Sequence, residues 1–343
     1  MNSFCRTVAG VATTLICLSS AQAAEITLTM HHFLSPKTPT QVKFLAPWAK
    51  KVEADSKGRI KIEIFPSMSM GGKPSELYRQ VRDGAADIVW TLPGYTPGVF
   101  PRSEVFELPT VHRGSAEVTN QAIQDNFKDI AADYKDVHPI LIHVHAGNAL
   151  HTVAKEINSV GDAQGLKLRT PSRTGAWMIE AWGAEPVGMP LPALPQALSK
   201  GTVDGALVPF EIFPPFKLQQ LTKYSVEGAD QSRFGTSVFM FAMNKDRYNS
   251  LPAELQKVID DNSGTAWAAS IGKVWDGNEA AGVALQEGSE GSKVIALDAQ
   301  AKASFDRVGQ TVVDRWITEA SKSGIDAVAL VKAARTSIAQ YSK

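Results

Sequence analysis

The stretch GLKLRTP occupies residues 165–171, and the stretch ALSKGTVDG follows it at residues 197–205. Because Pro171 bars the chain from continuing as a helix, the first stretch predicts a strand that ends in one arginine and then turns. Arg169 therefore stands at a strand end, where α/β proteins place their ligand contacts. Its planar guanidinium suits a carboxylate, which it can grip through two parallel hydrogen bonds. The second stretch predicts a helix end, a tight turn at Gly201 and the start of another strand.

The two motifs at this spacing resemble those of the solute receptors of TRAP transporters, the tripartite carriers that take up organic acids in bacteria. The resemblance covers nearly all of the chain after residue 25. It extends to further segments: APWAKKVE (46–53), GRIKIEIFP (58–66), VRDGAADI (81–88), LPGYTPG (92–98), Phe100-Pro101 with Glu104, and Glu107-Leu108-Pro109.

The resemblance implies a fold, a function and a partner. The fold is an α/β two-lobe periplasmic-binding-protein fold, with mixed sheets flanked by helices and one long helix shared by both lobes. In the family, the arginine of the GLKLR motif pairs with the ligand carboxylate, which assigns that role to Arg169. The closed receptor delivers a small organic acid to a membrane permease of a small and a large subunit, and an ion gradient drives transport without ATP.

The first 23 residues have the pattern of a signal peptide. Arg6 supplies a positive start, residues 8–18 are mostly apolar, and Ala21-Gln22-Ala23 is a small-residue cleavage site. The apolar run is too short to span a bilayer. Export through this leader predicts a periplasmic protein.

Composition excludes several kinds of partner. Both cysteines, Cys5 and Cys17, lie in the leader, so the mature chain is expected to form no disulfide. The whole chain has 35 Lys and Arg residues against 35 Asp and Glu residues, and it has no basic stripe that would bind nucleic acid. It also lacks a polybasic segment for a membrane surface and a later apolar run long enough to span a membrane. We expect a monomer with no nucleic-acid partner.

Strand and helix patterns alternate along the chain, which predicts α/β layering. Apolar residues that alternate or run together predict strands at 26–31, 60–64, 86–91, 139–146, 167–170, 185–188, 205–209 and 236–243. Helical spacing predicts helices at 39–54, 76–83, 115–136, 175–182, 195–199 and 254–287.

The boundaries of the two lobes come from the resemblance, because periodicity alone does not place them. After the signal peptide at residues 1–23, lobe I takes residues 24–148 and 239–273, and lobe II takes residues 149–238 and 274–320. Residues 321–343 form a C-terminal helical segment. Strands therefore cross between the lobes, and each lobe is discontinuous in sequence.

Aromatic side chains follow two predicted strands of lobe I. His32 and Phe33 come after the first strand, and Trp90 and Tyr95 come at the end of the third. Since strand ends carry ligand contacts in α/β folds, these four residues are candidates for the binding site. The three aromatic rings could stack on a ring of the ligand, although each alone is also an ordinary core residue.

The segment after the second motif is apolar where many related receptors carry polar residues for sugar hydroxyls. Val208 and Phe210 are expected to wall the pocket, with Glu211 beside them. Such a wall penalises a polyhydroxy ligand, whose hydroxyls would lose water without gaining partners. It favours a monocarboxylate with an apolar or aromatic body, such as an aromatic or 2-oxo acid. Phe234, near the crossover between lobes, is a further candidate, and plain core packing is an equal alternative for Phe210.

The number of anchors for the acid separates a monocarboxylate from a linear dicarboxylate. Similar receptors often carry a second basic residue near positions 148–151, where this chain has Asn148, Ala149 and Leu150. A second anchor would have to come from His32, His145 or Asn148. A linear dicarboxylate is therefore the alternative ligand.

A function of another class is a periplasmic metal-dependent hydrolase built on the His138–His151 cluster, which comprises His138, His143, His145 and His151. A catalytic zinc site needs three ligands and a water-activating group, and no His-Glu-x-x-His or cysteine-based spacing occurs. The chain also has no nucleophile elbow, phosphate-binding loop or dinucleotide fingerprint. We expect no enzyme activity, no metal and no cofactor.

Overall fold

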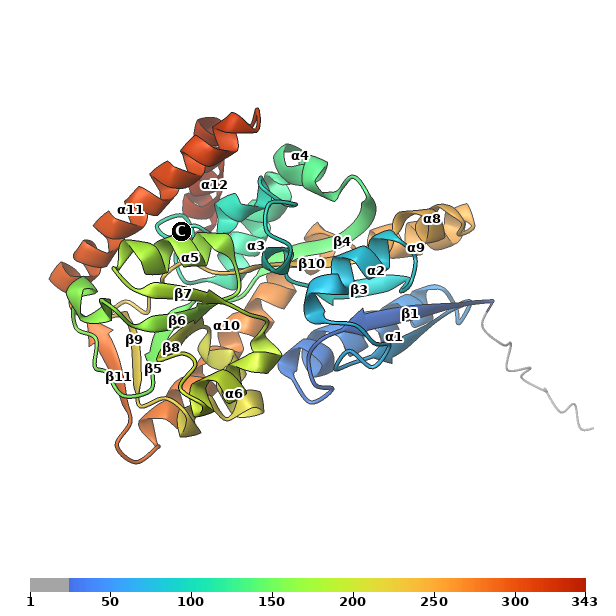
Figure 1. Cartoon of the computed structure of the whole chain (residues 1–343). Coiled ribbons are helices and arrows are strands. Elements are labelled where there is room, and N and C mark those ends of the chain that lie inside the picture. Colours follow the sequence, from blue (N-terminus) through green and yellow to red (C-terminus); the bar gives the residue numbers. More distant parts are fainter. Residues whose placement is uncertain (1–24) are drawn as a thin grey trace, which may run out of the picture.

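The computed structural model describes residues 25–343, so the predicted signal peptide and its cysteines lie outside the described residues. The first of two sheets has five strands in the order β2 (Ile60–Phe65), β1 (Ile26–His32), β3 (Ile88–Thr91), β10 (Val238–Asn244) and β4 (Val137–Val144). Strand β1 pairs in parallel with β2 and β3, whereas β10 is antiparallel to both β3 and β4. Figure 1 shows this sheet on the right of the molecule.

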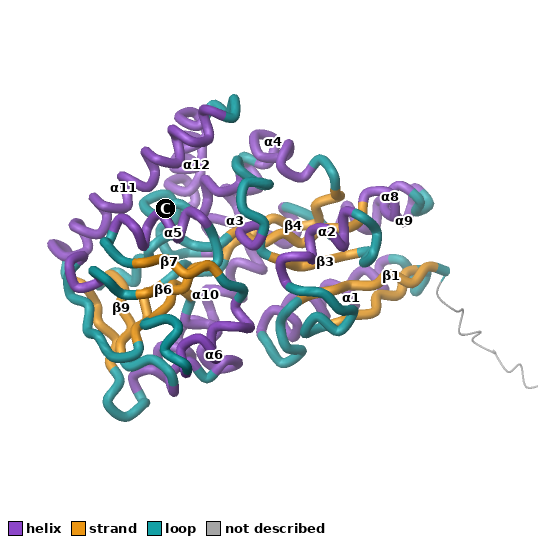
Figure 2. The backbone as a smooth tube through the Cα atoms, in the orientation of Figure 1, coloured by secondary structure: helices purple, strands orange, loops and turns teal. Residues whose placement is uncertain are grey.

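The second sheet has six strands in the order β11 (Lys293–Leu297), β9 (Tyr224–Gly228), β5 (Ala149–Thr152), β8 (Gly205–Val208), β6 (Lys167–Thr170) and β7 (Glu185–Gly188). Strands β6, β7 and β8 run parallel, and β5 runs antiparallel to β8 and β9. Figure 2 shows the strands of both sheets enclosed by helices. The predicted α/β two-lobe fold is confirmed.

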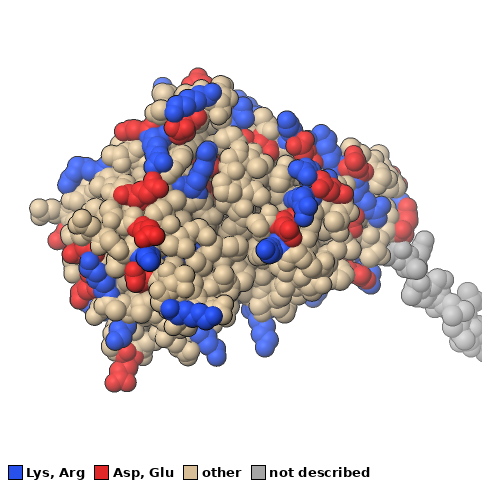
Figure 3. Space-filling view, viewed as in Figure 1, with Lys and Arg blue, Asp and Glu red and all other residues tan. Residues whose placement is uncertain are grey.

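Twelve α-helices in residues 25–343 cover the two sheets. They are α1 (Ala46–Asp55), α2 (Leu77–Arg82), α3 (Ala116–Asp125), α4 (Phe127–Ile130), α5 (Arg173–Ala181), α6 (Leu194–Ser199), α7 (Phe213–Phe216), α8 (Lys245–Asn249), α9 (Ala253–Asp261), α10 (Thr265–Glu287), α11 (Ala299–Lys322) and α12 (Ala327–Tyr341). No helix of this described part is both long and apolar enough to cross a membrane. Charged side chains of both signs are scattered over the face seen in Figure 3.

Helix α10 connects the two halves of the molecule. It packs against α3 and β4 beside the first sheet, and against α7, β11 and the short 3-10 helix η8 (Phe210–Ile212) beside the second. Two glycines permit this approach: a Cβ at Gly272 would overlap the backbone of Glu117, and a Cβ at Gly282 would overlap the carbonyl group of Phe210. Glycine is a poor helix former, but at Gly272 the missing side chain permits close contact with Glu117.

Several predicted elements differ from the observed ones. The predicted helix at 254–287 is two helices, because the chain breaks where Gly264 has a φ of 56° and Trp48 Nε1 donates to the carbonyl of Asn262 at 2.8 Å. The predicted helix at 115–136 ends as α3 at Asp125 and is followed by the short helix α4 and a 3-10 helix at Ala131–Tyr134. Strands β5, β9 and β11 were not predicted. β5 is buried at every position, so its sequence shows no alternation that would indicate a strand.

Candidate ligand-binding site

The carboxyl ends of parallel strands from both sheets border one cavity. Strands β1 and β3 supply loops from the first sheet, and β6 and β8 supply loops from the second. Such ends form ligand crevices in α/β folds. We call the cavity the interlobe chamber; it is lined by Phe33, Leu34, Trp90, Leu92, Tyr95, His145, Asn148, Arg169, Pro171, Leu191, Val208, Pro209, Glu211, Ile212, Ser237 and Phe239.

Arg169 brings a buried positive charge to the chamber, since the residue is only 2% exposed. Its Nε donates to the carbonyl of Met189 at 3.0 Å, and its Nη1 donates weakly to the carbonyl of Leu207 at 3.5 Å. Its Nη2 has no hydrogen-bond partner, and no carboxylate within residues 25–343 pairs with it. Burial lowers the pKa of Arg169, an effect that the nearby Tyr95 hydroxyl opposes. A buried cation without a counter-charge is costly, so this guanidinium is set up to receive an anion.

Two neutral hydrogen-bonding groups lie beside this cation in the chamber. His145 Nδ1 accepts from the N–H of Gly147 at 2.9 Å, which assigns the ring proton to Nε2. Burial lowers the pKa of His145 well below its usual value, so the ring is neutral. Asn148 is buried, and its Oδ1 has no hydrogen-bond partner. The imidazole through Nε2 and the amide through its Nδ2 group can both donate to an acid group next to Arg169, whereas Asn148 Oδ1 can only accept.

A stack of aromatic rings forms the wall on the side of the first sheet. Trp90 lies parallel to Phe33, with ring centroids 5.2 Å apart, and to Phe239, at 4.6 Å. The indole is held in place because its Nε1 donates to His143 Nε2 at 2.9 Å. Tyr95 meets Phe33 edge-on at 5.6 Å. Rings in this arrangement offer flat apolar surface to an aromatic ligand.

The wall on the side of the second sheet is apolar except for one carboxyl group. Leu191, Val208, Pro209 and Ile212 provide the apolar surface. Burial raises the pKa of Glu211 to about 8, and the charge of Glu279 adds to the shift. At neutral pH the Glu211 carboxyl is therefore protonated, and its O–H can donate a hydrogen bond.

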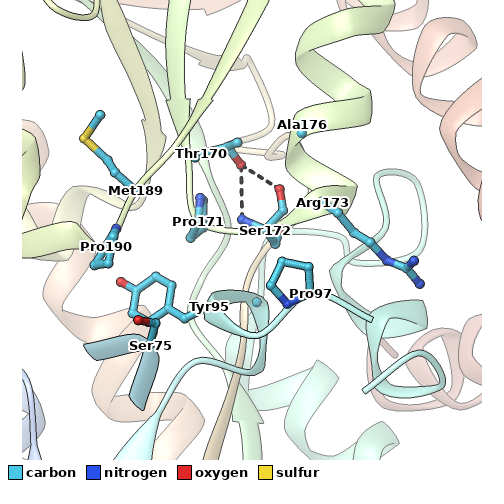
Figure 4. A pocket seen from close by; sticks show the side chains of 12 residues that line it. Ser75, Tyr95, Pro97, Thr170, Pro171, Ser172, Arg173, Ala176, Met189 and Pro190 are labelled. Carbon is cyan, nitrogen blue, oxygen red and sulfur yellow. Dashed lines mark hydrogen bonds between the residues drawn. The ribbon is translucent and has the colours of Figure 1, made fainter. Parts of the chain in front are cut away.

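A second cavity of about 320 Å³ lies at the edge of the interlobe chamber. Figure 4 shows its lining, which includes Ser75 and Tyr95 from one side and Met189 and Pro190 from the other. Tyr95 and Pro171 line both cavities. The Tyr95 hydroxyl accepts a hydrogen bond from the N–H of Leu191 at 2.9 Å, and this bond joins the two halves of the molecule where the cavities meet.

Arg173 forms an ion pair that the sequence did not indicate. Its Nε and Nη2 each donate to a carboxylate oxygen of Glu104 at 2.6 Å. Glu104 belongs to the 3-10 helix η4 (Ser103–Glu107) and also accepts from Trp316 Nε1 at 3.2 Å. Arg173 points away from the cavity in Figure 4. Arg169 and Arg173 therefore differ in their partners, because Arg173 is paired with a carboxylate and Arg169 is not.

Three residues of the predicted site lie elsewhere. Both ring nitrogens of His32 are used, by Gln41 at 3.0 Å and by the N–H of Leu34 at 3.3 Å. Phe210 packs in the core against His151 and Phe213, because a 3-10 helix points successive side chains about 120° apart. Phe234 packs against Trp182 and Phe305. The remaining predicted residues, Arg169, Asn148, Phe33, Trp90, Tyr95, His145, Val208 and Glu211, line the chamber.

Sequence reasoning missed Phe239 and Ser237, which enter the chamber at the start of β10. Every residue of β10 is buried, so no alternation shows which side chains face a ligand. Only their position in the chain could have indicated these two residues, because they lie at the predicted crossover between the lobes. Leu191 and Ile212 were missed for a similar reason, as each lies in a short turn after a strand.

The histidines at 138–151 do not converge. His138 stacks on Tyr248, His143 accepts from Trp90, and His151 contacts Ser225 Oγ at 2.7 Å and the carbonyl of Val208 at 3.1 Å. Within residues 25–343, no group of three or more His, Cys, Asp and Glu residues could hold a metal ion. The hydrolase interpretation therefore loses the ligand set on which it depended.

Comparison with known proteins agrees with this geometry. The family model described as bacterial extracellular solute-binding protein, family 7, matches residues 30–319. A TRAP solute-binding protein from a marine metagenome, specific for aromatic acid ligands and solved with 3-hydroxybenzoate, is 43% identical; the match covers 94% of this chain and 100% of that one, with a TM-score of 0.90. One from Rhodoferax ferrireducens, solved with benzoate, is 39% identical over 92% and 98% of the chains, with a TM-score of 0.88. One from Bordetella bronchiseptica, solved with (R)- and (S)-mandelate, is 26% identical over 92% and 99%, with a TM-score of 0.84.

Proposed function

Since this chain belongs to family 7 of the bacterial extracellular solute-binding proteins and is an extracytoplasmic receptor of a TRAP transporter, we propose that it captures an aromatic monocarboxylate. The family consists of receptors that bind small organic acids and work with the TRAP permease subunits. The three solved relatives hold 3-hydroxybenzoate, benzoate and mandelate, which are all aromatic monocarboxylates. Their likeness to this chain supports the same class of ligand here.

The observation that carries the proposal is the unpaired guanidinium of Arg169 in a chamber walled by aromatic rings. Its free Nη2 supports a carboxylate at this end, with His145 and Asn148 as neutral donors beside it. The stack of Phe33, Trp90 and Phe239 supports an aromatic body. Arg169 is the single Lys or Arg residue among the described residues that line the chamber, which supports one acid group rather than two.

We further propose that the receptor is a monomer that opens and closes at a hinge between its lobes, with lobe I at 24–148 and 239–273 and lobe II at 149–238 and 274–320. The chamber has a volume of about 30 Å³, which is room for little more than one or two water molecules. An aromatic acid therefore enters when the lobes move apart. Ligand favours closure because its acid group neutralises Arg169 while both walls contact its ring.

The ligand class is tested by thermal shift and calorimetry on the chain from residue 24 onward. Benzoate, mandelate and phenylpyruvate represent aromatic acids, succinate represents dicarboxylates, and glucuronate represents sugar acids. An aromatic acid at a hundred times its dissociation constant should add about 2.7 kcal/mol to the free energy of unfolding. Stabilisation by succinate or glucuronate alone would contradict the proposed ligand class and leave the receptor assignment in place.

Affinity for the acid should depend on pH through Glu211. Below its pKa of about 8 the carboxyl is neutral; above that pH it becomes an anion and repels the ligand carboxylate. Affinity for benzoate should be constant between about pH 6 and pH 7, and should then fall by up to about tenfold per pH unit above pH 8. The other titratable groups that line this space, Tyr95, His145 and Arg169, keep their charge in this range, because burial raises the pKa of Tyr95 and lowers that of His145, and Glu279 stays paired with Arg233.

Calorimetry of benzoate binding from pH 6 to pH 9 checks this dependence. In Glu211→Gln the decline above pH 8 should disappear, because the amide does not ionise. A decline of equal size in the variant would assign the effect to another group.

A further inference from the structure

The backbone around Glu211 is held in place by a buried carboxylate from α10. The N–H groups of Phe210 and Glu211 donate to the two oxygens of Glu279 at 3.3 and 2.9 Å. Glu279 is in turn paired with Arg233, whose Nη2 lies 3.3 Å away. These contacts fix the short helix η8 in position. None of them involves the Glu211 side chain.

The Glu211 carboxyl itself lines the interlobe chamber without a partner. The residue is 7% exposed, and no hydrogen bond or salt bridge of the described residues includes its carboxyl oxygens. A carboxyl group that is largely removed from water and has no protein partner costs free energy until a ligand group bonds it. Its lining neighbours Val208, Pro209 and Ile212 offer no side-chain polar atom. The polar residues of the chamber, Tyr95, His145, Asn148 and Ser237, form no hydrogen bond with the Glu211 carboxyl either, so the carboxyl is available to a ligand.

The ligand carboxylate is not the group that Glu211 is best suited to bind. Arg169 supplies the cation for that carboxylate, and it forms no salt bridge with Glu211, so the two side chains can serve different parts of one ligand. A neutral carboxyl presents one O–H donor and one carbonyl acceptor. A hydroxyl group offers the matching pair, one acceptor and one donor.

We propose that Glu211 recognises a hydroxyl substituent on the ring of the ligand, so that the receptor selects hydroxylated aromatic acids over unsubstituted ones. The inference rests on the proposed function, since it assumes an aromatic acid anchored at Arg169. The Glu211 O–H donates to the hydroxyl oxygen, and its carbonyl oxygen accepts the hydroxyl proton. A ring without the substituent leaves the carboxyl buried and unpartnered, which is how a polar site rejects an analogue that lacks the polar group.

The experiment is calorimetry at pH 7 with benzoate, the three hydroxybenzoate isomers and their methoxy analogues. In the wild-type chain, at least one hydroxybenzoate should bind about tenfold more tightly than benzoate. The methoxy analogue of that isomer, which cannot donate, should lose this advantage. Glu211→Gln should keep the preference, because an amide also carries a donor and an acceptor. Glu211→Leu should bind benzoate at least as well as the wild type and show no hydroxyl preference.

Glu107→Gln is the matched control. Burial raises the pKa of Glu107 to about 7, but its carboxylate is already bonded to Thr174 Oγ1 at 2.6 Å and to the N–H of Val238 at 3.1 Å, and it does not line the chamber. This variant should keep the preference for a hydroxyl group.

The possible outcomes separate the two proposals. Equal affinity for benzoate and all hydroxybenzoates, or an undiminished preference in Glu211→Leu, overturns the role of Glu211 and leaves an aromatic-acid receptor. Should Glu211→Leu fail to fold, the comparison of hydroxy and methoxy ligands on the wild-type chain decides, and equal affinities overturn the inference. Failure of every aromatic acid to bind the folded wild-type chain overturns the proposed function as well.

Discussion

Replacing Arg169 with methionine is expected to weaken capture of aromatic acids severely while changing the stability of the ligand-free protein little. Removing one partner of a buried charge pair costs about 2–5 kcal/mol, which corresponds to a loss of affinity of roughly 30-fold to several thousand-fold. Stability should change little, because removal of a buried charge without a carboxylate partner among the described residues offsets the loss of its hydrogen bonds to the carbonyls of Met189 and Leu207. A buried charge can often be replaced by an apolar side chain of similar volume without loss of stability.

Arg173→Met is the control, because Arg173 lies four positions after Arg169, at the start of α5. Its guanidinium holds Glu104 through two bonds of 2.6 Å, and Glu104 is largely buried, with a side-chain exposure of 12%. Loss of this pair should lower the free energy of unfolding by about 1–3 kcal/mol, a range reduced for the partial exposure of Arg173. Binding in the chamber should persist at temperatures where the variant is folded.

Thermal melts and calorimetry with benzoate measure both properties for the two variants. The assignment of the anchor fails if Arg169→Met binds benzoate within a few-fold of the wild type. It also fails if Arg173→Met loses binding while Arg169→Met keeps it.

Replacing glycines of α10 with alanine should lower the stability of the protein at two positions and raise it at a third. At Gly272 and Gly282 a Cβ would overlap the backbone of Glu117 and of Phe210 respectively. Backbone cannot move aside as a flexible side chain can, so each substitution should lower the free energy of unfolding by about 1–3 kcal/mol or more. At Gly277 nothing lies within 4 Å of the added Cβ, and alanine there should raise stability by about 0.5–1 kcal/mol, since glycine is a poor helix former.

Gly282→Ala should also weaken ligand binding, because Phe210 precedes Glu211 in η8 and its displacement moves the chamber wall. Gly272→Ala lies against α3 and should affect stability more than affinity. Denaturant titrations of the three variants, with calorimetry on the folded ones, check these expectations. Equal effects of alanine at Gly277 and Gly282 would contradict the packing role of Gly282.

Local sequence patterns predicted several strands and residues of the candidate site. Strands β6 and β7 were predicted with their observed bounds, Lys167–Thr170 and Glu185–Gly188, because glycine and proline mark their ends. Arg169 was placed at a strand end for the same local reason. The aromatic residues Phe33, Trp90 and Tyr95 were proposed because they lie at or just after the ends of β1 and β3, whose carboxyl ends border the chamber.

The errors concern side chains whose surroundings come from distant segments. Phe210 and Phe239 are equally apolar in the sequence, yet the first packs against His151 and the second stacks on Trp90. The ion pair of Arg173 has no local signal in the sequence, because its partner, Glu104, lies 69 positions earlier in the chain. The protonated state of Glu211 depends on burial and on Glu279 from α10.

The sequence by itself determined the α/β class, the family and the arginine proposed as the anchor of the ligand. Strand and helix periodicity, turn residues and short motifs are properties of neighbouring positions, so they can be read without the fold. Only the tertiary structure decided which rings face the chamber, that Arg169 lacks a carboxylate partner and that Glu211 stands there without a bond. Burial, charge pairing and the direction of a side chain arise from contacts between segments far apart in the chain, and no local pattern of residues specifies them.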